Sequence, residues 1–190
     1  MTGEEQAHEV HDLMSDCLAG LACMHAQRIV HGNLKPSNLL FSQAGGRRCA
    51  KLADFALLPT LQRVLAAAGT AAGDDTDALP FVPPERAGSP HLLSQAADVW
   101  SLGAIFYYLL TGHHPRTGGA SGAAGSNPIQ DRLVPIRMHY RVVPRSLDGL
   151  LDLIDRALAA SPEDRFPSAI EMREQFLRLA RPLAVRVELP

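Results

Sequence analysis

The 190-residue sequence predicts a mainly helical α+β domain with one small β-hairpin. Apolar residues recur at helical spacing near the start of the chain, and two short apolar strands flank a Gly-Gly pair. The stretch 97–110 is apolar on nearly every side, which is typical of a helix buried in a core. This length suits a single domain, so we expect one domain organised around that helix.

The first element is an amphipathic helix that begins within ten residues of Met1. Its apolar residues recur at i, i+3, i+4, i+7, i+8 and i+11, which is the spacing of one helix face. They are Val10, Leu13, Met14, Cys17, Leu18 and Leu21. We expect this helix to end at a turn near residues 27–28.

A hairpin and a long loop follow. Residues 39–41 and 49–53 read as two short strands, with Gly45-Gly46 in the connection between them. Residues 57–80 mix Ala, Gly, Asp and Thr with weak periodicity, so we expect a long mobile loop there.

The second half of the chain is helical apart from one insert. Residues 116–127 are rich in Gly, Ala and Ser, which predicts a flexible insert. Two amphipathic helices are expected at 147–158 and 168–179. The second opens with Ser168 and has Glu171 three residues later, which is a capping box.

The composition excludes several classes of protein. A net charge of −2 gives no strong attraction to nucleic acid or to an anionic membrane surface. The longest apolar run is too short to span a bilayer. Three cysteines form no C-x-x-C pair and suggest a reducing compartment. We therefore expect a cytoplasmic protein that binds neither nucleic acid nor a membrane.

Two short motifs carry the functional interpretation. Residues 31–38 read H-G-N-L-K-P-S-N, and residues 54–56 read D-F-A. In protein kinases the catalytic loop is H-R-D-L-K-P-x-N and the metal-binding motif is D-F-G. The spacing is the same here, while the Arg, the catalytic Asp and the last Gly are replaced.

Three further segments extend the match. Residues 81–85 (F-V-P-P-E) resemble the Y-x-A-P-E segment that closes an activation loop. Residues 98–103 (D-V-W-S-L-G) and 161–166 (S-P-E-D-R-F) match two later segments in the same order. From about residue 9 to residue 178, the chain therefore resembles the C-terminal lobe of the Ser/Thr protein kinase family. The resemblance makes 57–80 an activation-loop-like segment.

The features of a kinase N-terminal lobe are not found. An active kinase needs a G-x-G-x-x-G loop and a strand Lys that binds nucleotide. The sequence has no such loop, and its only lysines, Lys35 and Lys51, lie in the catalytic loop and before the D-F-A motif. We therefore expect a protein kinase-like fold in which residues 1–190 form the C-lobe alone and the N-lobe is absent.

The resemblance assigns roles to individual residues. Asn38 and Asp54 are the metal ligands, Lys35 contacts the γ-phosphate, and Leu40 lies on the face that meets the adenine ring. Asn33 stands at the position of the catalytic Asp. A neutral amide is a poor proton acceptor, and loss of a general base lowers a rate by about 10²–10⁴-fold. Alternatively, the two candidate metal ligands only brace the loop through hydrogen bonds.

Other departures surround this site. Gly32 removes the Arg that reads activation-loop phosphate in many kinases. Ala56 replaces a hinge glycine. Residues 77–78 (D-A) stand where the family has Gly-Thr, so a hydroxyl that contacts the catalytic Asp and Lys is missing.

The resemblance also implies structural roles. His31 packs on Phe55 as a spine residue, Glu85 forms an ion pair with Arg165, and Asp98 opens the buried central helix.

We interpret the chain as a pseudokinase-like binding or regulatory module with weak affinity for ATP and Mg²⁺. It would bind another protein chain, or itself, through the apolar face around Leu40 and Phe55 that a missing N-lobe leaves open. The alternative is a Ser/Thr kinase that phosphorylates protein hydroxyls when an N-lobe is supplied in cis or in trans. A third interpretation is a truncated relic without selected activity.

Overall fold

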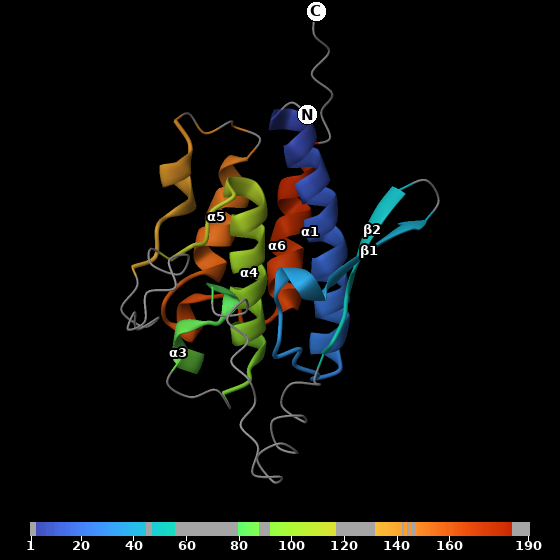
Figure 1. The fold of residues 1–190 in the computed structure, drawn as a ribbon, viewed down its shortest axis with the longest axis vertical. Helices are drawn as coiled ribbons and strands as arrows, with labels where there is room; N and C mark the ends of the chain where they lie inside the picture. Colours follow the sequence, from blue (N-terminus) through green and yellow to red (C-terminus); the bar gives the residue numbers. More distant parts are fainter. Residues whose placement is uncertain are drawn as a thin grey trace, which may run out of the picture.

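The computed structural model describes residues 3–44, 47–55, 80–87, 92–116, 132–141, 143, 145 and 147–183. Within these ranges, long helices stand side by side and a two-stranded hairpin lies against the outer helix α1 (Figure 1). Helix α1 contacts α6 and α4, and α4 also contacts α5. The prediction of a mainly helical fold with a small hairpin is confirmed.

Helix α1 (Gly3–Ala26) buries the predicted apolar stripe. All six residues at the predicted spacing are less than 9% exposed, and they belong to the main hydrophobic core. Burial of this stripe against α4 and α6 is what stabilises the helix, because an isolated amphipathic helix is marginal in water.

The hairpin pairs β1 (Leu39–Ala44) with β2 (Arg47–Leu52) in antiparallel register, Leu39 opposite Leu52. The N–H of Ala50 donates to the Asp16 carboxylate of α1 at 3.0 Å. This bond pairs a backbone donor of β2, the strand that packs on α1, and fixes the hairpin to that helix.

Helix α4 (Gln95–Thr111) is the core of the domain. Ser94 caps its start by accepting a hydrogen bond from the Ala97 N–H at 3.0 Å. Gly112 ends it in the left-handed conformation (φ 71°), which glycine adopts without strain. Every residue from 97 to 107 is buried, as the all-round apolar sequence predicts.

The remaining elements are shorter or lie at the C-terminal side. They are α3 (Pro84–Ala87), α5 (Asp148–Ala157), α6 (Ala169–Leu183) and the 3-10 turns η1 (Pro36–Asn38), η3 (Ile136–His139) and η4 (Pro162–Asp164). The two predicted helices agree with α5 and α6 within a few residues at each end. Ser168 accepts a hydrogen bond from the Ile170 N–H at 3.0 Å, and its hydroxyl contacts the Glu171 carboxylate.

Several expectations fall outside the described residues. They are the Gly45-Gly46 connection, Ala56, the activation-loop-like segment 57–80 apart from Pro80, and the insert 116–127 apart from Arg116. Among the described residues, no helix is both long enough and apolar enough to cross a membrane.

Candidate functional site

Asn38 ends the 3-10 turn η1 and lies at the junction of two segments. The residue is 3% exposed, and its Nδ2 donates to the Asn33 carbonyl at 2.7 Å. Its backbone carbonyl accepts from the Ala53 N–H at 2.9 Å. The amide nitrogen is therefore engaged in the loop, and Oδ1 is the side-chain atom that remains for a cation.

Asp54 directly follows the residue that bonds to Asn38. Its backbone is left-handed (φ 58°), a conformation that non-glycine residues seldom adopt and that often marks a functional site. Its side chain is exposed. The Asn38–Ala53 hydrogen bond thus brings the two candidate metal ligands into one neighbourhood.

Asn33 and Lys35 lie on the same loop, and both are half-buried. The N–H of Asn33 donates to Nδ1 of His31 at 3.3 Å, and its carbonyl holds Asn38. The backbone of the loop is therefore held by internal bonds. The side chain at the base position is an amide, which has no basic electron pair to take a proton from a hydroxyl.

His31 is fully buried beneath the loop. Its ring lies edge-to-face with Phe55, with ring centroids 6.5 Å apart, as the resemblance implies. Burial lowers the pKa of His31, and the nearby Asp98 carboxylate opposes this shift. Nδ1 accepts a hydrogen bond, so the ring proton is on Nε2.

Asp98 joins the loop to the core. The residue is 2% exposed, and its carboxylate accepts from the N–H groups of His31 (2.7 Å) and Gly32 (2.8 Å). Nε2 of His25 lies 3.1 Å from the same carboxylate. The Ala169 N–H donates to the other ring nitrogen of His25 at 2.9 Å, so His25 is in its Nε2–H form and donates to Asp98.

No motif in the sequence points to His25, although the helical pattern does. His25 lies four residues after Leu21, on the continuation of the apolar stripe of α1. A polar residue at such a position is buried with a partner. Here the partners come from the starts of α4 and α6, so His25 ties three helices together.

No motif points to Arg86 either. It lies in α3, and its Nη1 donates to the Gly32 carbonyl at 2.7 Å. Gly32 has a left-handed backbone (φ 74°), which suits glycine and no β-branched or bulky residue. Position 32 has no side chain of its own, and the arginine that contacts its carbonyl comes from α3.

Glu85 and Arg165 form the ion pair that the resemblance implies. Two guanidinium nitrogens bind the two carboxylate oxygens at 2.7 and 2.8 Å. The remaining donors of Arg165 bind the carbonyls of Ala159, Ala160 and Ala96. Arg165 is 1% exposed, and all its donors are used.

An apolar surface lies beside the candidate metal ligands. Leu40 is 56% exposed, Phe41 54% and Phe55 51%. Leu40 is on β1 and Phe55 follows Asp54, so both lie next to the loop of Asn38. Phe41 is also on β1, but successive side chains of a strand point to opposite faces, so Phe41 lies on the other face of the hairpin from Leu40.

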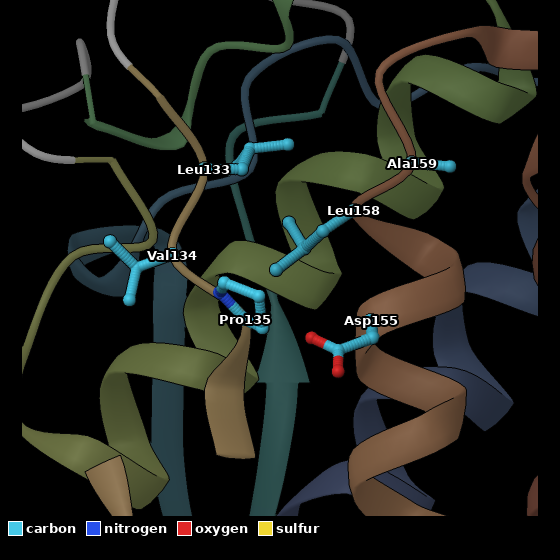
Figure 2. Close-up of a pocket in the computed structure, with 6 residues that line it drawn as sticks. All are labelled: Leu133, Val134, Pro135, Asp155, Leu158 and Ala159. Atoms are coloured by element: carbon cyan, nitrogen blue, oxygen red, sulfur yellow. The ribbon is translucent and has the colours of Figure 1, made fainter. Parts of the chain in front are cut away.

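A cavity of about 290 Å³ lies elsewhere, between the end of α5 and the segment before η3 (Figure 2). It is lined by Leu133, Val134, Pro135, Asp155, Leu158 and Ala159. Asp155 accepts from the Ile136 N–H at 3.1 Å, and burial raises the pKa of its carboxyl. None of the candidate site residues lines this cavity.

The donor set suits a magnesium ion that is bound together with phosphate. Mg²⁺ prefers oxygen ligands and is held by one or two protein groups plus substrate phosphates. Asp54 provides a carboxylate and Asn38 an amide oxygen. Among the described residues, no group of three or more His, Cys, Asp or Glu could hold a metal alone. The residues therefore fit a metal–nucleotide complex better than a bare ion.

Comparison with known proteins places the chain in a family. The protein kinase domain family matches residues 2–177. The Ser/Thr-protein kinase PknL of Mycobacterium tuberculosis is 31% identical over 183 residues, covering 96% of this chain and 43% of that protein. PknB of Mycolicibacterium smegmatis is 28% identical, covering 88% of this chain and 26% of that protein. The chain thus spans less than half the length of these relatives.

The fold of a solved kinase agrees. A double mutant of the Mycobacterium tuberculosis PknI kinase domain superposes with a TM-score of 0.59 at 20% identity. The match covers 91% of this chain and 56% of the other. By sequence match and by fold, this chain belongs to the protein kinase domain family.

Proposed function

We propose that this chain is a pseudokinase-like module that binds a magnesium nucleotide weakly and does not transfer phosphate. One observation carries the proposal: Asn33 occupies the base position, whereas the metal-ligand positions keep Asn38 and Asp54. The Asn38 carbonyl accepts from the N–H of Ala53, the residue before Asp54, and this bond supports the proposal that the two ligands act together.

The chemistry of each retained residue suits this role. Asn38 and Asp54 would hold the cation, and the Lys35 ammonium would contact a phosphate. Leu40, which is exposed beside them, would meet the base of the nucleotide. The magnesium ion would neutralise part of the phosphate charge. Without the basic oxygen of an aspartate at position 33, the attacking hydroxyl keeps its proton.

We expect weak, metal-dependent nucleotide binding. ADP with Mn²⁺ should broaden the NMR signals of amides next to Asn38 and Asp54, because Mn²⁺ is paramagnetic and takes the same oxygen ligands as Mg²⁺. Asp54→Asn should weaken this effect about tenfold or more, since it removes the charged ligand. Stabilisation by a weak ligand should be small, about 0.4 kcal/mol when the ligand concentration equals Kd.

Asp12→Asn is the matched control, because Asp12 is an exposed carboxylate on α1, 57% exposed in its side chain. It should leave the broadening unchanged. Broadening that is spread evenly over the protein, or that survives both Asp54→Asn and a chelator, would contradict the proposed site.

The second candidate is a Ser/Thr kinase whose N-lobe is supplied in cis or in trans. It is favoured by the named relatives, which are Ser/Thr-protein kinases much longer than this chain. Transfer of labelled phosphate from ATP to a protein substrate separates the two candidates. Transfer that Asp54→Ala abolishes would support the kinase. Under the pseudokinase proposal neither wild type nor Asn33→Asp transfers phosphate, because catalytic groups act as a unit.

We also propose that the apolar surface around Leu40 and Phe55 binds a second protein chain or another copy of this one. Contiguous exposed apolar surface on a globular domain usually marks an interaction site. We expect the wild type to self-associate in sedimentation measurements at increasing concentration. The double variant Leu40→Asp, Phe55→Ser should sediment as a monomer.

Leu92→Asp provides the control, since Leu92 is 54% exposed on the segment before α4 and lies outside this surface. It should associate like the wild type. If the wild type stays monomeric and binds no hydrophobic dye, this surface is not an interaction site.

A further inference from the structure

Arg86 acts on the backbone of the loop that carries the candidate metal site. Its Nη1 donates to the Gly32 carbonyl at 2.7 Å across 54 residues of sequence. The N–H of Gly32 donates to the Asp98 carboxylate at 2.8 Å. Gly32 therefore lies between two charged groups, with its donor on the carboxylate and its acceptor on the guanidinium.

The two charges hold the loop in one orientation. Asp98 is buried and, among the described residues, accepts from the N–H groups of His31 and Gly32 and from His25. Burial lowers the pKa of Arg86, while the Asp98 carboxylate and then Glu85 oppose the shift. Arginine stays protonated under these conditions. Charge-assisted hydrogen bonds of this kind are roughly twice as strong as neutral ones.

The anchored peptide leads directly to Asn38. The residue after Gly32 is Asn33, whose carbonyl accepts from Nδ2 of Asn38 at 2.7 Å. The Gly32 carbonyl belongs to the peptide just before the one that carries the Asn33 carbonyl, so a change of backbone direction at residues 32–33 would carry the Asn33 carbonyl with it and release the amide. The direction of Asn38 Oδ1 therefore depends on the bond between Arg86 and Gly32.

We propose that Arg86 is a positioning residue that holds the 31–33 backbone so that Asn38 keeps its amide bonded to Asn33 and presents Oδ1 to a cation. Gly32 has no side chain of its own, so the positively charged group that contacts this peptide is the Arg86 guanidinium from α3. The part of this inference that concerns the cation rests on the proposed function, whereas the anchoring of Asn38 does not.

The test compares Arg86→Met with Arg86→Lys, and with Arg178→Met as control, because Arg178 is exposed on α6. The first readout is the rate of hydrogen exchange, measured by NMR, of the Asn38 side-chain amide and of the Gly32 N–H. In Arg86→Met both should exchange at least tenfold faster, while amides of α4 and α6 change less than twofold. Arg86→Lys should restore most of the protection, and Arg178→Met should match the wild type.

The second readout is the affinity for Mn²⁺ with ADP, which should fall at least fivefold in Arg86→Met and recover in Arg86→Lys. If Arg86→Met does not fold, Arg86→Gln takes its place, because it removes the charge and keeps a shorter side chain.

The outcomes separate the two proposals. If the wild type binds no Mn²⁺ with ADP, the proposed function fails, and the exchange of the Asn38 amide alone decides the role of Arg86. Unchanged Asn38 exchange in the Arg86 variants would overturn the positioning role. A second result would also overturn it. If the wild type binds Mn²⁺ with ADP, and Arg86→Met exchanges faster but binds with the same affinity, then Arg86 is only structural.

Discussion

Replacing Arg165 by methionine should destabilise the domain by about 3–5 kcal/mol, which is the range for removing one partner of a buried ion pair. Arg165 is 1% exposed and binds both oxygens of Glu85. Methionine fills similar volume but leaves the Glu85 carboxylate and three backbone carbonyls without their donors. Typical domains have about 5–15 kcal/mol of stability, so this loss would remove a large share of it.

The measurement is urea unfolding followed by the fluorescence of Trp100, which is the only tryptophan of the sequence and is fully buried. Arg137→Met is the matched control. Arg137 also binds two carboxylates, those of Asp148 and Asp152, but all three side chains are at least 36% exposed. Exposed pairs contribute little. Equal shifts of the urea midpoint in the two variants would contradict this account.

A double variant, Arg165→Met with Glu85→Leu, refines the test. Replacing both partners of a buried pair by apolar residues often restores stability, because no unpaired charge remains. The double variant should therefore be more stable than Arg165→Met alone. If it is equally unstable, the carbonyls of Ala159, Ala160 and Ala96 that Arg165 binds account for the loss.

Local patterns in the sequence were enough to find the helices and the hairpin. Burial of α1 follows from apolar periodicity, and burial of α4 follows from a run that is apolar on nearly every side; both are properties of neighbouring residues. The Glu85–Arg165 pair came from the family pattern, since 80 residues separate its members and no local rule connects them.

The contacts that hold the loop were harder to foresee. His25 bonds to Asp98 across 73 residues, and Arg86 bonds to a backbone carbonyl that any residue could provide. Such contacts depend on how helices meet, and neither composition nor periodicity encodes that.

Asp98→Ala should be the second large loss of stability, at least about 3 kcal/mol, since each unsatisfied buried donor costs about 1–3 kcal/mol. The change removes the acceptor of three donors: the N–H groups of His31 and Gly32, and Nε2 of His25. Alanine also leaves a void at the start of α4, where Asp98 is 2% exposed. Unfolding in urea, followed through Trp100, measures the loss.

Asp98→Asn should lie between Asp98→Ala and the wild type. The amide keeps one oxygen that can accept, but its NH₂ group faces a donor and the negative charge opposite Arg86 is lost. Asp12→Ala is the control, because it removes an exposed carboxylate from α1. If Asp98→Ala shifts the midpoint no further than Asp12→Ala does, the carboxylate does not hold the loop. The candidate site would then need another anchor to the core.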